Sequence, residues 1–108
     1  MKRIAIIDLG TNTFNLLIID KTVNSFKEVY STKVGVGLGL GGINENRIHE
    51  DAAARALATL KIYKDKAVEL NVVKFVAFGT SAIRNATNKV EFIEQIRSEI
   101  GINVVEIS

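Results

Sequence analysis

A carboxylate, a glycine and three hydrogen-bonding side chains follow one another in the segment Asp8-Leu9-Gly10-Thr11-Asn12-Thr13. A short apolar run precedes them, which places Asp8 at the end of an expected strand. A carboxylate there can hold Mg²⁺, usually through waters. Gly10 allows a tight turn, and the N–H groups and side chains of the next three residues can surround phosphate oxygens. Taken alone, the segment equally permits an ordinary hairpin turn.

A second candidate site is the segment Gly79-Thr80-Ser81-Ala82-Ile83-Arg84-Asn85-Ala86. A strand that ends in Gly-Thr-Ser and opens a helical turn offers hydroxyls, N–H groups and a favourable dipole to an anion. Arg84 comes about one helical turn after Ser81, so its guanidinium could reach the same anion as a fork-shaped donor. The alternative is a capped helix start with Arg84 in solvent.

Two other features, a glycine-rich stretch and a histidine, give weaker indications of a site. Residues Gly37–Gly42 match G-x-G-x-x-G, but they follow an expected edge strand, and the next helix begins too late for a dinucleotide-binding fold. We therefore expect a flexible surface loop beside the site. His49 precedes a helix and could serve as a base, although a capping or solvent role is the simpler interpretation. Asn46 and Arg47 are expected on a solvated face.

The composition narrows the choice of chemistry. With 108 residues the chain is expected to form a single domain, residues 1–108. The chain has 14 Lys and Arg and 12 Asp and Glu, which is only a mild basic excess. The basic residues form no cluster interleaved with aromatic residues, so nucleic acid is not an expected partner. The absence of cysteine and the single histidine exclude a thiolate or multi-histidine metal site. No apolar segment approaches about 20 residues, so we expect no membrane span and a cytoplasmic location.

Five strands are expected around these motifs. The apolar run of residues 3–9 fits a buried central strand. Residues 14–20 form a second strand, antiparallel to the first because only a short turn joins them. Residues 26–34 carry Lys27 and Lys33, which suits a strand at the edge of a sheet. Residues 72–78 and 102–107 are the fourth and fifth strands.

Two main helices are expected between the later strands. Apolar residues recur at helical spacing over residues 50–70, with acidic residues in the first turn. A second helix follows Asn88, an expected N-cap that would form a capping box with Glu91. Gly101 suits the position just after the end of this helix.

This order of elements predicts an α/β fold. Three strands form an antiparallel meander, and two parallel strands follow, each after a helix. The arrangement is similar to a ribonuclease-H-like core with a mixed five-stranded sheet, which is the half-lobe of actin-like proteins.

Both candidate segments, taken together, resemble one protein family. Residues Ile6–Leu17 resemble the first phosphate motif of the exopolyphosphatase and guanosine-pentaphosphate phosphohydrolase family, a motif shared across the actin-like ATPase superfamily. Residues Gly79–Asn88 resemble the family's T-S-A-x-R-x-A-x-N segment, which is more selective. The loop Val36–Gly42 lies where the family has a glycine-containing loop, so the resemblance extends over nearly the whole chain.

The resemblance implies an activity and assigns roles to residues. Members of the family release terminal phosphate from inorganic polyphosphate or guanosine pentaphosphate with Mg²⁺, in a cleft between two actin-like lobes. Asp8 would then position the metal, and Arg84 would contact the substrate phosphate in catalysis. The residues that would bind substrate are Gly10, Thr11, Asn12, Thr13, Thr80, Ser81 and Arg84.

One part of the family pattern is missing from this sequence. In the family, a G-x-x-E-A segment with the general base follows the fifth strand, whereas this chain ends at Ser108. We therefore expect the N-terminal portion of the first actin-like lobe of a longer phosphatase, inactive by itself. The alternatives are the lobe of an actin-like ATPase or sugar kinase, and a non-catalytic phosphate-binding or assembly fragment. The sequence does not choose between the two substrates, and an uncovered sheet face would permit a homodimer.

Overall fold

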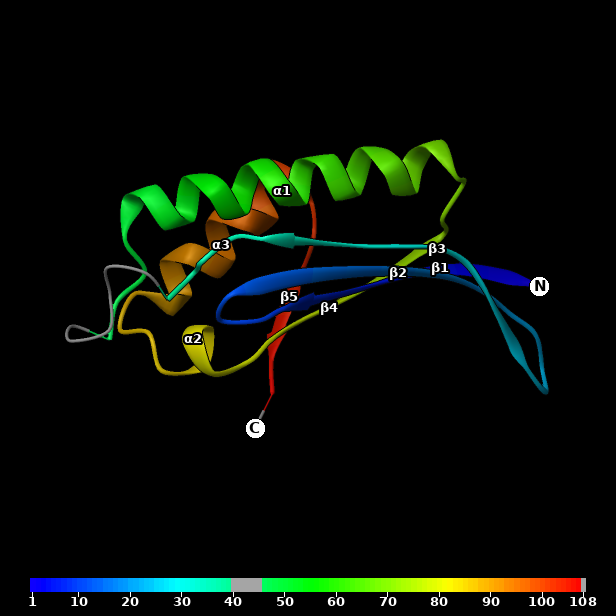
Figure 1. Cartoon of the computed structure of the whole chain (residues 1–108), viewed down its shortest axis with the longest axis horizontal. Coiled ribbons are helices and arrows are strands. Elements are labelled where there is room, and N and C mark those ends of the chain that lie inside the picture. Colours follow the sequence, from blue (N-terminus) through cyan, green and yellow to red (C-terminus); the bar gives the residue numbers. More distant parts are fainter. Residues whose placement is uncertain (40–45, 108) are drawn as a thin grey trace.

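The computed structural model describes residues 1–39 and 46–107 and arranges them as one mixed sheet with its two main helices on one side (Figure 1). The strands are β1 (Lys2–Leu9), β2 (Thr13–Lys21), β3 (Phe26–Gly35), β4 (Lys74–Gly79) and β5 (Val104–Glu106). The helices are α1 (Glu50–Glu69), α2 (Ser81–Arg84) and α3 (Lys89–Ile100). The five expected strands and two main helices are confirmed, although β5 is shorter than the predicted residues 102–107. No helix in these two ranges has the length and apolar character that crossing a membrane requires.

The sheet has the strand order β3-β2-β1-β4-β5, with β1 at its centre. β1 pairs antiparallel with β2 and parallel with β4, and β4 pairs parallel with β5. β3 is an outer strand, as its lysines indicate. Leu9 lies opposite Gly79, so β1 and β4 end at the same edge of the sheet. This pairing brings the two candidate segments together.

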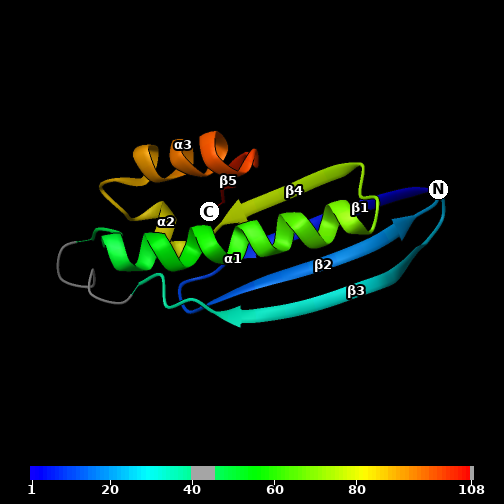
Figure 2. The same cartoon turned by 90° about the horizontal axis from the view of Figure 1, so that it is seen from above.

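α1 and α3 lie side by side over one face of the sheet (Figure 2). Ala5, Ile7 and Leu9 of β1 are buried against them, because alternate residues of a strand point to the same side. The hydroxyl of buried Tyr63 in α1 donates a 2.7 Å hydrogen bond to the carbonyl of Phe14 in β2. Burial raises the pKa of Tyr63, so this hydroxyl remains a donor and fixes α1 over the start of β2.

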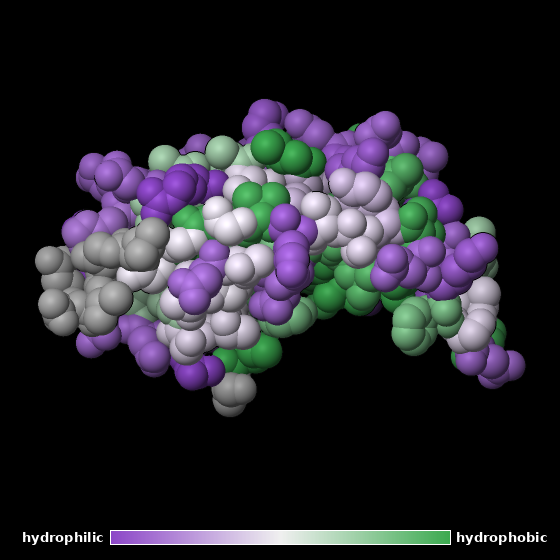
Figure 3. Space-filling view, viewed as in Figure 1, coloured by the Kyte–Doolittle hydropathy of each residue, from purple (hydrophilic) through white to green (hydrophobic). Residues whose placement is uncertain are grey.

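The opposite face of the sheet carries no helix in the described part of the chain (Figure 1). Val76, Val105 and Ile107 are 39%, 62% and 42% exposed there. Figure 3 shows hydrophobic surface in the hollow below the strands. The chain therefore has one covered and one open sheet face.

The start of α3 differs from the prediction. Asn88 is the N-cap residue, but its side chain makes no capping hydrogen bond, so the expected capping box with Glu91 is wrong. The Asn88 amide instead pairs with the backbone of Ile48, which lies 40 residues earlier. A local sequence pattern cannot reveal so distant a partner. The end of the helix agrees with the prediction, since Gly101 has the left-handed conformation with φ of 80°.

Candidate functional site

The turn between β1 and β2 lies at the sheet edge where β1 and β4 end. The N–H of Gly10 donates to the carbonyl of Thr13 at 3.1 Å and closes this turn. A Cβ added to Gly10 would lie only 2.8 Å from that same carbonyl oxygen. The turn therefore requires glycine at this position, because any side chain would push the backbone apart.

The backbone after β3 covers the carbonyl groups of this turn. The N–H groups of Val36 and Gly37 both donate to the carbonyl of Asn12 at 2.9 Å. The N–H of Gly39 donates to the carbonyl of Thr11 at 3.1 Å. In contrast, the N–H groups of Thr11 and Asn12 donate to no residue that the structure describes. A turn with occupied carbonyls and open N–H groups favours an anion as its ligand.

The glycine-rich segment Gly37–Gly42 is only partly described. Residues 37–39 lie against the turn, and residues 40–42 lie outside the described residues. A Cβ added to Gly39 would lie 2.8 Å from Cγ2 of Thr11. The loop therefore contacts both the backbone and the side chain of Thr11, and it holds that residue from one side.

α2 approaches the turn from the other side. Oγ1 of Thr11 and Oγ of Ser81 are 3.1 Å apart, within hydrogen-bond distance. The N–H of Thr80 donates to the carbonyl of Leu9 at 3.3 Å. These contacts join the two candidate segments across 70 residues of sequence.

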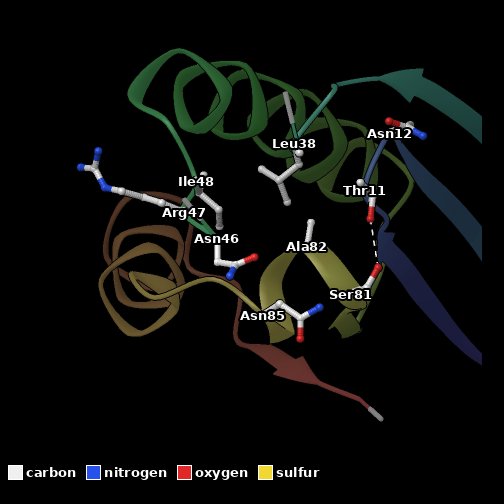
Figure 4. A pocket seen from close by; sticks show the side chains of 10 residues that line it. Thr11, Asn12, Leu38, Asn46, Arg47, Ile48, Ser81, Ala82 and Asn85 are labelled. Atoms are coloured by element: carbon white, nitrogen blue, oxygen red, sulfur yellow. Dashed lines mark hydrogen bonds between the residues drawn. The ribbon is translucent and has the colours of Figure 1, made fainter. Parts of the chain in front are cut away.

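A pocket of about 250 Å³ opens beside the two hydroxyls (Figure 4). Its walls come from the turn, the loop after β3, residues 46–48 and α2. Asn46, Arg47 and Asn85 line it. The sequence placed Asn46 and Arg47 on a solvated face, and Asn85 lies within the second candidate segment without a predicted role of its own. Asn85 comes one helical turn after Ser81, a spacing that could have indicated it. The sequence near Asn46 and Arg47 carries no such signal, because their place in the wall depends on a contact with a distant segment.

Asp8 lies at the end of β1, between Asn15 of β2 and Phe78 of β4. Its Oδ1 atom is buried and accepts no hydrogen bond from the described residues. A buried carboxylate oxygen without a donor costs free energy unless water or a cation meets it. Within residues 1–39 and 46–107, no three His, Cys, Asp or Glu side chains gather as a metal cluster. A single open carboxylate fits Mg²⁺ rather than zinc, because Mg²⁺ keeps several of its waters.

The side chain of Arg84 points away from the pocket in this structure. Its side chain is exposed, and Nη1 donates a 2.9 Å hydrogen bond to the carbonyl of Ile107 after β5. Arg84 is not one of the residues that line the pocket. The structure therefore brings Thr11 and Ser81 together but does not bring Arg84 to them.

Two other residues considered from the sequence, Thr13 and His49, lie outside the lining of the pocket. Thr13 begins β2, where it lies opposite Gly35 of β3. His49 is the N-cap residue of α1, and its side chain makes no capping hydrogen bond. Neither side chain lines the pocket.

Comparisons with known proteins show the family and the fold of this chain. The model of the Ppx/GppA phosphatase family matches residues 17–108. An exopolyphosphatase from Cytophaga hutchinsonii superimposes with a TM-score of 0.94 at 44% identity, covering 98% of this chain and 34% of that one. The Ppx/GppA family member of Aquifex aeolicus has a TM-score of 0.92 at 30% identity, covering 98% of this chain and 35% of that one. These superpositions confirm the expected fold class.

Two less similar proteins extend the comparison. Exopolyphosphatase 1 of Mycobacterium tuberculosis (strain H37Rv) is 26% identical over 103 residues, which are 94% of this chain and 30% of the relative. T. thermophilus RuvC has a TM-score of 0.54 at 10% identity, which shows a shared fold alone. The chain spans about a third of the length of the family relatives it matches. From the match over residues 17–108, the chain belongs to the Ppx/GppA phosphatase family.

Proposed function

We propose that the protein to which this chain belongs releases terminal phosphate from inorganic polyphosphate or guanosine pentaphosphate. The observation that carries the proposal is the 3.1 Å contact between the hydroxyls of Thr11 and Ser81, which joins the two candidate segments at one sheet edge. Membership of the Ppx/GppA phosphatase family supports the reaction class. Two of the similar proteins are named as exopolyphosphatases.

The terminal phosphate would meet the open N–H groups of Thr11 and Asn12. Phosphoryl transfer depends on positioning and on neutralising charge, and fixed N–H groups do both without rearrangement. Arg84 would add a cationic donor after leaving the carbonyl of Ile107, which costs one exposed hydrogen bond. The proposed substrate-binding residues are Gly10, Thr11, Asn12, Thr13, Thr80, Ser81 and Arg84.

Asp8 is the proposed ligand of Mg²⁺, held mainly through waters. The buried Oδ1 without a hydrogen-bond donor supports this role, because a cation would satisfy it. When bound, Mg²⁺ would neutralise charge on the phosphate oxygens. Asp8 would keep that positive charge at the end of β1, next to the turn that binds the phosphate.

We further propose that this chain is the N-terminal portion of the first actin-like lobe of a longer phosphatase. Hydrolysis requires an acceptor for the proton of the attacking water. The proposed site holds N–H donors, hydroxyls and one metal-binding carboxylate. None of these groups is proposed to accept the proton of the attacking water. This chain by itself would therefore bind a phosphate chain without hydrolysing it.

The test is phosphate release by the full-length protein with polyphosphate, guanosine pentaphosphate and ATP in parallel. We expect release from at least one of the first two substrates, and we expect a Mg²⁺ chelator to abolish it. The preferred substrate would follow from the same assay. Release from ATP alone would contradict the proposal and favour an actin-like ATPase or kinase instead.

A further inference from the structure

We propose that Asn88 is a positioning residue that fixes one wall of the pocket beside the phosphate turn. It would do so by holding the segment Asn46–Ile48 against the segment that follows α2. The inference rests on the proposed function, because it assumes that substrate enters this pocket.

The two segments are joined by three hydrogen bonds. The N–H of Thr87 donates to the carbonyl of Asn46 at 2.7 Å. The N–H of Ile48 donates to Oδ1 of Asn88 at 3.0 Å. Nδ2 of Asn88 donates back to the carbonyl of Ile48 at 2.9 Å. The Asn88 side chain thus offers Ile48 one acceptor and one donor, as the backbone of a neighbouring strand would.

This use of Asn88 replaces the usual one at a helix start. Asn88 is the N-cap residue of α3, a position where an asparagine oxygen normally accepts from the N–H groups of the first turn. Here the side chain makes no such bond and turns to Ile48. Its geometry therefore serves the contact between two loops rather than the stability of α3.

The wall that Asn88 holds forms one side of the pocket. Figure 4 shows Asn46 and Ile48 on this wall, Ala82 and Asn85 on the side of α2, and the hydroxyls of Thr11 and Ser81 at the end away from Arg47. Ile48 is only 3% exposed, so a shift of its backbone would have to move packed neighbours as well. Without Asn88, only the bond from Thr87 to Asn46 would remain of the three.

The test compares the full-length wild-type protein with the variant Asn88→Ser, using inorganic triphosphate with Mg²⁺ as the probe. Serine is neutral and caps helices well, but it is too short to pair with both backbone groups of Ile48. We expect triphosphate to bind about tenfold more weakly, as for the loss of one good hydrogen-bonded contact. In the phosphate-release assay KM should rise by about the same factor, with kcat changed less than about twofold. Hydrogen exchange at the N–H of Ile48 should become faster.

A matched control separates positioning from general loss of stability. Arg3→Met removes an ion pair with Asp20 at the other end of the sheet. It should lower the free energy of unfolding and leave triphosphate affinity unchanged. Wild-type protein that does not bind triphosphate would count against the proposed function itself. Wild-type protein that binds, with Asn88→Ser binding equally well, would overturn the role of Asn88.

A second variant covers the case in which Asn88→Ser is too unstable to assay. Asn88→Asp keeps an acceptor for the N–H of Ile48 and is a strong cap for α3, but it cannot donate to the carbonyl of Ile48. Val90→Asp adds the same charge two residues later, where the side chain is 72% exposed. We expect Asn88→Asp to bind triphosphate several-fold more weakly than Val90→Asp does. Equal affinity of these two variants would also overturn the inference.

Discussion

Asp8 and Asp20 lie on neighbouring strands, near opposite ends of the same sheet, and their surroundings differ. Asp20 in β2 accepts two hydrogen bonds from the guanidinium of Arg3, at 2.7 and 2.9 Å. Arg3 also donates to the carbonyl of Leu70, just after α1. Asp8 in β1 has a buried oxygen that no described residue meets. The Asp20 carboxylate is paired with Arg3 and stabilises the fold, whereas Oδ1 of Asp8 accepts no hydrogen bond from the described residues.

The same contrast extends to the backbone around each carboxylate. At the Arg3 end, charged groups pair with one another, and the hydrogen bonds from Arg3 lower the pKa of Asp20. At the other end, the loop after β3 occupies the carbonyls of Thr11 and Asn12 but leaves their N–H groups open. A buried polar atom is normally paired, and Oδ1 of Asp8 is not, within the described residues. Open N–H groups follow it in the chain at Thr11 and Asn12, so this end of the sheet is the one that a ligand would complete.

The largest expected effect is that of Asp8→Asn on activity. Loss of the carboxylate should reduce phosphate release by the full-length protein at least about 100-fold, as for removal of one transition-state contact. The free energy of unfolding should stay the same or rise by up to about 1 kcal/mol, since a charge without a donor is removed. Phosphate release and urea unfolding measure the two effects.

Asp20→Asn is the matched control for Asp8→Asn. It should lower the free energy of unfolding, because Arg3 loses its charged partner, and it should leave phosphate release within about twofold of wild type. The comparison between the two carboxylates fails if Asp8→Asn remains active, or if Asp20→Asn is as inactive as Asp8→Asn.

Arg84→Ala should give a smaller loss of activity. Removing a cationic phosphate contact should reduce turnover about 10- to 100-fold. The free energy of unfolding should change little, since the exposed side chain makes a single hydrogen bond to the carbonyl of Ile107. Arg97→Ala on α3 is a control that removes an exposed arginine paired with Glu94. Turnover of Arg84→Ala equal to that of Arg97→Ala would remove Arg84 from the site.

Gly39→Ala should act on the site through Thr11. The added methyl group would lie 2.8 Å from Cγ2 of Thr11, so that side chain must shift relative to Ser81. We expect triphosphate to bind about 5- to 10-fold more weakly, as for one disturbed hydrogen bond. Gly35→Ala is the matched control, because nothing lies within 4 Å of a Cβ added there. Calorimetric titration of both variants measures the difference, and equal affinity would show that the loop does not hold Thr11.

The smallest expected effect is on how the free energy of unfolding that Asp20 contributes depends on pH. The hydrogen bonds from Arg3 lower the pKa of Asp20. Their stabilisation is therefore complete above the pKa of an unfolded aspartate, about 3.9, and is lost as the pH falls through the lower folded value. The difference in unfolding free energy between wild type and Asp20→Asn should stay constant above roughly pH 5 and shrink in acid. A difference that grows in acid would contradict this assignment.

The order of elements could be predicted from sequence because it depends on local patterns. Apolar runs and helical spacing located β1, β2 and α1 within one or two residues of their observed bounds. The left-handed residue after α3 followed from Gly101 alone. Such signals lie within a few residues of the feature that they predict.

The candidate site could be predicted only in part, since its contacts are distant in sequence. Motif types indicated Thr11 and Ser81, but the wall formed by Asn46 and Arg47 depends on hydrogen bonds to residues 87 and 88. Asn88 at a helix start has two competing partners, the first turn of α3 and Ile48. A single sequence favours the local partner, and the fold uses the distant one.

The most direct test of an anion site at the end of β1 is a titration of this chain with inorganic triphosphate and Mg²⁺, followed by backbone amide NMR. We predict saturable shifts of the amides of Thr11, Asn12 and Ser81, with the amides of Arg3 and Asp20 unchanged. No saturable shift at the turn, or shifts that are larger at the Arg3–Asp20 end, would contradict the account.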